Sequence, residues 1–169
     1  IGTANYQGMG APMQYFDESL RDQSFALMGQ RLRAEIDAAD RRLGMITDQR
    51  AGVPRAPGKW SRKEIVGHLI DSAANNHQRF VRAQSDPVRL PGYAQEHWVT
   101  SQRYSKRAWR DLIDLWSSYN RHLAHVVAHI PESRRSTPCE IGEGPPVPLS
   151  HIALDYIGHL QHHLKQVFE

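Results

Sequence analysis

The sequence predicts an all-α protein, a four-helix bundle with a long loop between its second and third helices. Four segments carry apolar residues at the three- and four-residue spacing that places them on one helix face. No segment alternates apolar and polar residues clearly enough to predict a strand with confidence. The connections between the four segments are long, which indicates a bundle with at least one crossover connection.

The first helix is predicted over about Asp17–Leu43, and Gly44 is expected to end it. Its apolar face consists of Leu20, Leu27, Leu32, Ile36, Ala39 and Leu43. A linker with several Pro and Gly residues then leads to the second helix.

The second helix opens on a capping box, Ser61-Arg62-Lys63-Glu64, in which Ser61 accepts a backbone N–H and Glu64 reaches back to the cap. Trp60 precedes it as a staple residue. The helix is predicted to continue to about Gln84, because Asp86-Pro87 cannot extend it. The stripe that is predicted to face the core consists of Ile65, Leu69, Ala73, Asn76 and Phe80.

Residues 86–104 form the long loop, and loops of this length without regular structure are uncommon unless they serve a function. Tyr93 and Trp98 within it could fold over a site.

Ser105 is predicted to cap the third helix, and Pro131 is predicted to stop it. Residues 136–149 are rich in Pro and Gly and could form a short hairpin. The fourth helix is predicted from near Leu149 to the end of the chain. The apolar face of the third helix consists of Trp109, Leu112, Ile113, Trp116, Tyr119, Leu123, Val127 and Ile130.

Composition limits the classes of function. The chain has 169 residues, which favours one domain, predicted over residues 10–169; residues 1–9 are interpreted as a tag or cleavage scar. The net charge of +3 comes with no basic stripe, so no nucleic-acid partner is expected. No apolar run is long enough to span a membrane, and no secretory signal is visible. Cys139 is the only cysteine, which excludes an intramolecular disulfide and favours the cytoplasm.

The ten histidines are the unusual feature of the composition. His159 and His163 are four residues apart, so they stack on one face of the fourth helix and can reach one ion. His68 lies at the edge of the apolar face of the second helix, and Ser72, Asn75 and Arg79 continue the same line. Convergence of the three histidines would make an open metal site of the catalytic type. The alternative is that each histidine is a buried or half-exposed residue with no metal role.

Other sites are less well supported. His122, His125 and His129 share a face of the third helix that lies opposite its apolar side, so they are predicted to be solvated. No helix carries the Glu-x-x-His pattern of a dimetal carboxylate centre. Cys139 has no partner signature of a nucleophile, and residues 142–145 lack the strand–helix context of a phosphate loop.

These residues resemble the DinB/YfiT-like superfamily over roughly residues 58–169. The motifs, in order, are Gly58-Lys59-Trp60-Ser61, His68-Leu69-Ile70-Asp71-Ser72, Asn76, Arg79-Phe80, Tyr93, Trp98 and His159-Leu160-Gln161-His162-His163. The resemblance implies a four-helix bundle, often dimeric. It implies that His68, His159 and His163 bind a divalent ion, often zinc or nickel. Members are described as metal-dependent hydrolases, and some are similar to S-transferases that use bacillithiol, mycothiol or glutathione.

Four functions remain open. The first is metal-dependent transfer of a low-molecular-weight thiol to an electrophile, with a small-molecule substrate and with Arg79 holding a carboxylate of the thiol. The second is hydrolysis by metal-activated water, for which Glu96 is the only suggested base, and a weak one. The third is a non-catalytic metal or small-molecule binder, and the fourth, suggested only by the pI near 9.2, is a DNA-associated protein. The lack of a clear base favours thiol transfer slightly.

Overall fold

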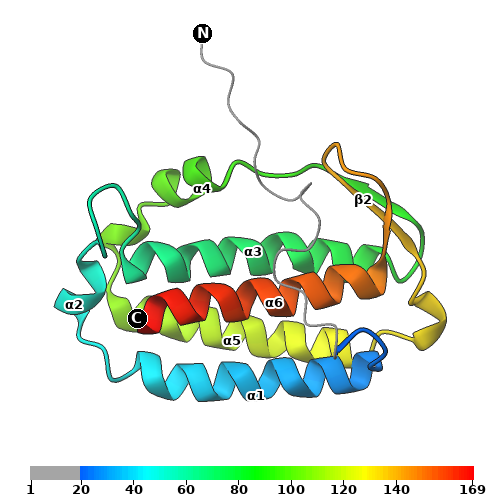
Figure 1. Ribbon diagram of the computed structural model, residues 1–169, viewed down its shortest axis with the longest axis horizontal. Helices are drawn as coiled ribbons and strands as arrows, with labels where there is room; N and C mark the ends of the chain where they lie inside the picture. Colours follow the sequence, from blue (N-terminus) through cyan, green and yellow to red (C-terminus); the bar gives the residue numbers. More distant parts are fainter. Residues whose placement is uncertain (1–19) are drawn as a thin grey trace, which may run out of the picture.

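Four long helices lie side by side in the computed structural model, which describes residues 20–169 (Figure 1). This arrangement confirms the predicted all-α four-helix bundle. Residues 1–9 and residues 17–19 of the predicted first helix lie outside the described part. The long helices are α1 (Phe25–Leu43), α3 (Arg62–Arg82), α5 (Trp109–Ala128) and α6 (Leu149–Phe168).

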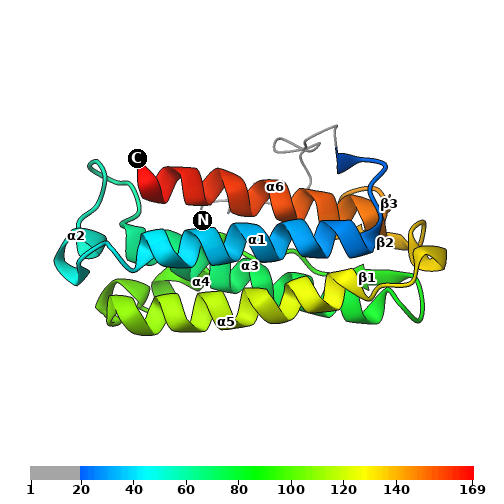
Figure 2. The ribbon, with the colours of Figure 1, turned by 90° about the horizontal axis from the view of Figure 1, so that it is seen from below.

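The chain direction explains the long loop. α3 and α5 run in the same direction, whereas α1 and α6 run in the opposite one (Figures 1 and 2). The connection from α3 to α5 must therefore return along the bundle, over the length of a helix of 21 residues, or about 30 Å. It is not a structureless loop: it contains β1 (Val88–Leu90), the short helix α4 (Gln95–Ser101) and the 3₁₀ turn η2 (Tyr104–Lys106).

The first helix begins later than predicted. Ser24 is its N-cap, and its hydroxyl accepts a hydrogen bond from the backbone N–H of Leu27. Leu20 is buried but lies in a 3₁₀ turn before the helix, and Leu27 is 39% exposed, so it does not belong to the apolar face. The linker that follows also contains a short helix, α2 (Asp48–Gly52).

The start of α5 also differs from the prediction. The capping box at Ser61 is present as predicted. Ser105, however, lies in η2 and caps nothing; α5 begins at Trp109. The carboxylate of Asp48 accepts a hydrogen bond from the backbone N–H of Trp109 at 2.7 Å. This N–H has no partner within α5, so it is capped by a side chain of α2 rather than by a residue just before the helix.

The structure contains three short strands that periodicity could not predict. β2 (Pro138–Ile141) and β3 (Val147–Pro148) form the hairpin expected in residues 136–149, and β1 pairs with β2 in parallel. Gly142 adopts a φ of +64° in the hairpin turn, which favours glycine. Strands of two to four residues are too short to show alternation, and β1 gains its partner only across the fold.

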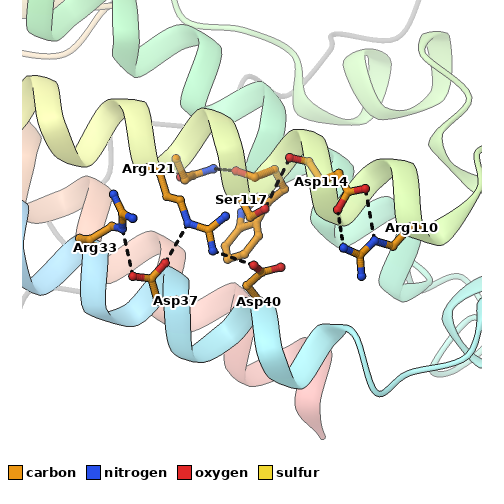
Figure 3. A network of polar contacts seen from close by, with 9 residues as sticks. Arg33, Asp37, Asp40, Arg110, Asp114, Ser117 and Arg121 are labelled. Carbon is orange, nitrogen blue, oxygen red and sulfur yellow. Dashed lines mark hydrogen bonds and ion pairs between the residues drawn. The ribbon is translucent and has the colours of Figure 1, made fainter.

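α1 packs closely against α5. A Cβ atom on Gly29 would lie 2.5 Å from Cβ of Ala128, so this contact requires a glycine. On the surface of the pair, Arg121 donates to Asp37 and Asp40 (Figure 3). These ion pairs are partly exposed and contribute at most about 1 kcal/mol each, so the apolar core carries the stability of the bundle. No helix in residues 20–169 is long and apolar enough to cross a membrane.

Candidate metal centre

The fold brings His68, His159 and His163 together between α3 and α6. The two helices pack against each other in opposite directions, so the first half of α3 faces the second half of α6 (Figure 1). One ring nitrogen from each histidine lies within 4.8 Å of the others. His68 is fully buried, His159 is 7% exposed, and His163 is half-buried. Among the described residues, no other set of three His, Cys, Asp or Glu side chains converges in this way.

Outer contacts of His159 and His163 leave one ring nitrogen of each as a possible ligand, whereas Nδ1 of His68 is buried without a hydrogen-bond partner among the described residues. Nδ1 of His163 lies 3.0 Å from Oε1 of Gln166, which can only accept, so Nε2 of His163 is left as a ligand. Nδ1 of His159 lies 3.4 Å from Oγ of Ser72. Such outer contacts orient histidine ligands in metal sites.

The spacing of the ring nitrogens fits a divalent ion. Nε2 of His68 and Nε2 of His159 lie 3.1 Å apart. Two nitrogen ligands of a tetrahedral zinc ion would be separated by about 3.3 Å, given zinc–nitrogen bonds of about 2.0–2.1 Å. The donor set of three imidazoles is that of an open catalytic site, with room for a further ligand.

Burial keeps the three imidazoles in the neutral form that metal coordination requires. Burial, and after it the nearby His163, lowers the pKa of His68 to about 3. Burial lowers the pKa of His163 to about 4, despite the opposing hydrogen bond to Gln166. The pKa of His159 is held well below 6.5, first by burial and then by its histidine neighbours.

Aromatic side chains cover the histidine cluster. The ring of Trp60 lies 5.1 Å from that of His68, and the ring of Tyr93 lies 6.5 Å from it. Trp98 of α4 packs on Tyr93 with 5.1 Å between the ring centroids. Tyr93 and Trp98 of the crossover connection therefore fold over this site, and they limit the access of water to it.

The polar line along α3 is buried, with one change from the predicted set. Ser72 is fully buried and contacts His159, and Arg79 is 2% exposed. Between them lies Asn76, which donates to the backbone oxygen of Ser72 and accepts from Nη1 of Arg79 at 3.2 Å. Asn75 is half-buried, and its amide donates to the backbone oxygen of Asp71. The row that leaves the metal centre is therefore Ser72–Asn76–Arg79.

Asp71, to which the sequence patterns assign no role, is a buried carboxylate three residues after His68 on α3. Asp71 is 2% exposed, and its Oδ1 accepts from Tyr104 at 2.7 Å and from Gln102 at 2.6 Å. Its Oδ2 is buried without a hydrogen-bond partner among the described residues. Burial raises the pKa of Asp71, although the two hydrogen bonds oppose this. Gly67 makes the arrangement possible, because a Cβ there would lie 2.1 Å from the ring of Tyr104.

The other candidates lie apart from the centre. His122, His125 and His129 are exposed, as their helical phase predicted. Glu96 is exposed in α4 and accepts from the indole of Trp60 at 3.2 Å. Cys139 is fully buried, and burial raises the pKa of its thiol to about 11, which leaves it unreactive near neutral pH.

We expect the helical fold to survive removal of the metal. The buried core runs through all four long helices, so the chain does not depend on the ion for its stability. Chelation followed by circular dichroism should leave the helical signal unchanged. A collapse of helicity on chelation would show instead that the centre is structural.

Comparisons with known proteins agree with the four-helix-bundle fold. The sequence model of the DinB superfamily matches residues 31–167. Among solved structures, the chain is similar to YfiT from Bacillus subtilis, which is described as a probable metal-dependent hydrolase with an unusual four-helix bundle topology. The match has a TM-score of 0.70 and 16% sequence identity, and it covers 94% of this chain and 89% of YfiT. No curated protein matches the chain significantly in sequence.

Proposed function

Because the chain belongs to the DinB superfamily, we propose that it is a divalent-metal-dependent enzyme that transfers a low-molecular-weight thiol to a small electrophilic substrate. The observation that carries this proposal is the buried trio of histidines. His68, His159 and His163 would hold the ion, zinc or nickel, through neutral nitrogens. The ion, when bound, supplies a positive charge that lowers the pKa of a coordinated thiol or water.

The polar row along α3 supports a thiol as the nucleophile. Ser72, Asn76 and Arg79 lead away from the histidines in steps of one helical turn, so they can contact a polar molecule larger than water. Arg79 offers a buried cation that suits a carboxylate of a thiol such as glutathione, bacillithiol or mycothiol. The aromatic cover of Trp60, Tyr93 and Trp98 would exclude bulk water during the transfer.

Hydrolysis is the second candidate, and Asp71 favours it. The sequence favours thiol transfer partly because it shows no clear general base for hydrolysis. In the structure, however, the buried carboxylate of Asp71, whose pKa is raised, lies one helical turn from His68. The description of YfiT as a probable metal-dependent hydrolase supports the same reading. Water would then take the place of the thiol at the same centre.

The test is a comparison of thiols and esters with one preparation of zinc-loaded protein. We expect metal-dependent conjugation of at least one biological thiol to a model electrophile such as monochlorobimane. His68→Ala should reduce the rate to that of a chelated control. Arg79→Ala should raise KM for the thiol roughly tenfold or more, since it removes a charged hydrogen-bond partner. His125→Ala, on the exposed face of α5, should behave like the wild type.

The outcomes separate the candidates. Equal rates with and without metal for every thiol would contradict thiol transfer. Metal-dependent cleavage of an activated ester under the same conditions would then favour hydrolysis. If neither reaction depends on metal, and spectroscopy of the cobalt form shows a coordination sphere that admits no added ligand, the protein is a non-catalytic metal binder.

A further inference from the structure

Asp71 is a buried acid with no basic side chain paired to it. No Lys, Arg or His among residues 20–169 forms an ion pair with its carboxylate, and its 2% exposure gives little access to water. The groups that face it are the hydroxyl of Tyr104 from η2, the amide of Gln102 after α4, and Tyr93 from the segment before α4. None of them supplies a positive charge.

This environment is costly for the fold. Burying a carboxylate without a countercharge is unfavourable, and Oδ2 also lacks a hydrogen bond. The contacts to Tyr104 and Gln102 need only an acceptor oxygen, which the neutral amide of asparagine would provide at lower cost. A purely structural link between α3 and the crossover connection therefore does not account for an acid at this position. Buried, unpaired ionisable residues, which lower the stability of the fold, are concentrated at functional sites.

The position of Asp71 relates it to the metal centre. It follows His68 by three residues on α3, a spacing that places side chains about 5–6 Å apart at Cβ. Ser72, the next residue, contacts His159 directly. The helical period places Asp71 about 60° around α3 from His68. Tyr93 packs beside His68, and the charge of Asp71 contributes to raising the pKa of Tyr93.

We propose that Asp71 accepts the proton of the nucleophile at this centre, through Oδ2. This inference rests on the proposed function, and it holds for either nucleophile. In the step, the S–H bond of the thiol or the O–H bond of water breaks, and a new O–H bond forms on Asp71. The electron pair stays on sulfur or oxygen and forms the bond to the electrophile. Asp71 then passes the proton to the leaving group, so the carboxylate is restored.

The first test needs no substrate. Asp71→Asn keeps an acceptor for Tyr104 and Gln102 but removes the buried charge. In the metal-free full chain near neutral pH, we expect this variant to unfold a few degrees higher than the wild type. Because the folded-state pKa of Asp71 is raised, the destabilisation by this carboxyl group is complete above that pKa and disappears only below the pKa of the unfolded chain. The gain should therefore shrink on acidification and vanish when the carboxyl group is protonated in both states. A lower unfolding temperature in Asp71→Asn would overturn the proposal and make Asp71 a structural anchor.

The second test uses the zinc-loaded protein with monochlorobimane and a biological thiol, and an activated ester in parallel. We expect Asp71→Asn to lower kcat roughly hundredfold or more, the range for loss of a general base, with metal content unchanged. The acid limb of the pH–rate profile should disappear with it. Tyr104→Phe removes one hydrogen bond but keeps the acid, so it should lose far less.

These outcomes distinguish the two proposals. An active wild type with an equally active Asp71→Asn variant would overturn the role of Asp71 alone. A wild type without metal-dependent activity on any probe would contradict the proposed function. The unfolding comparison would then still decide whether Asp71 is a structural anchor.

Discussion

His163→Ala is expected to reduce the bound divalent metal from about one equivalent per chain to a trace. The reason is the small number of ligands: three neutral imidazoles would hold the ion, and the loss of one would leave two, without a carboxylate or thiolate among the neighbouring ligand atoms. Gln166 would also lose the ring that it orients. Metal analysis of protein purified without a His-tag, after dialysis against metal-free buffer, measures the effect.

The matched control is His125→Ala. Both positions are helical histidines, but His125 is exposed on α5, and its ring centroid lies 4.2 Å from that of its neighbour His129. Its removal should leave the metal content unchanged. If His125→Ala lost the metal and His163→Ala kept it, the ion would be bound at the exposed face of α5. That result would refute the centre between α3 and α6.

Much of this centre could be predicted from local pattern. The four-residue spacing of His159 and His163 places them on one helix face whatever surrounds the helix. The phase of His68 relative to Leu69 and Ile65 places it at the edge of the buried side of α3. The same reasoning correctly placed His125 in solvent. These predictions needed only the helical period and the expectation that apolar faces meet.

Other features depend on partners far away in sequence, and no local pattern shows them. Trp109 begins α5 because Asp48, 61 residues earlier, accepts its backbone N–H. In the sequence, Asp71 is a polar residue beside an apolar stripe, as on many surface helices. Its burial depends on Tyr104 and Gln102, which lie 33 and 31 residues later and donate hydrogen bonds to its carboxylate. One signal was present in the sequence: Gly67 interrupts the buried face of α3, and the close approach of Tyr104 explains it.

The stability of the metal-free protein should fall steeply on acidification, through the same three histidines. Their pKa values in the folded state lie below 6.5, at about 3 for His68 and about 4 for His163. Below pH 6.5 the unfolded chain therefore takes up protons that the folded chain refuses, so the free energy of unfolding decreases as the pH falls toward 4. Each such histidine contributes a slope that approaches about 1.4 kcal/mol per pH unit where its unfolded form is protonated and its folded form is still neutral.

His68→Gln isolates one such contribution. Urea unfolding of the chelated proteins, followed by circular dichroism from about pH 7 to about pH 5, should show an average slope smaller by about 1 kcal/mol per pH unit in this variant than in the wild type. His125→Gln should keep the wild-type slope, because His125 lies outside the cluster. Protonation of Asp71 works in the opposite direction, since its folded-state pKa is raised, but both variants retain it and it cancels in the comparison. An unchanged slope in His68→Gln would mean that His68 accepts its proton in the folded state as readily as in the unfolded chain. Protons would then compete with the metal ion for the imidazole nitrogens near neutral pH, and the three-histidine centre would be a much weaker metal site than its geometry indicates.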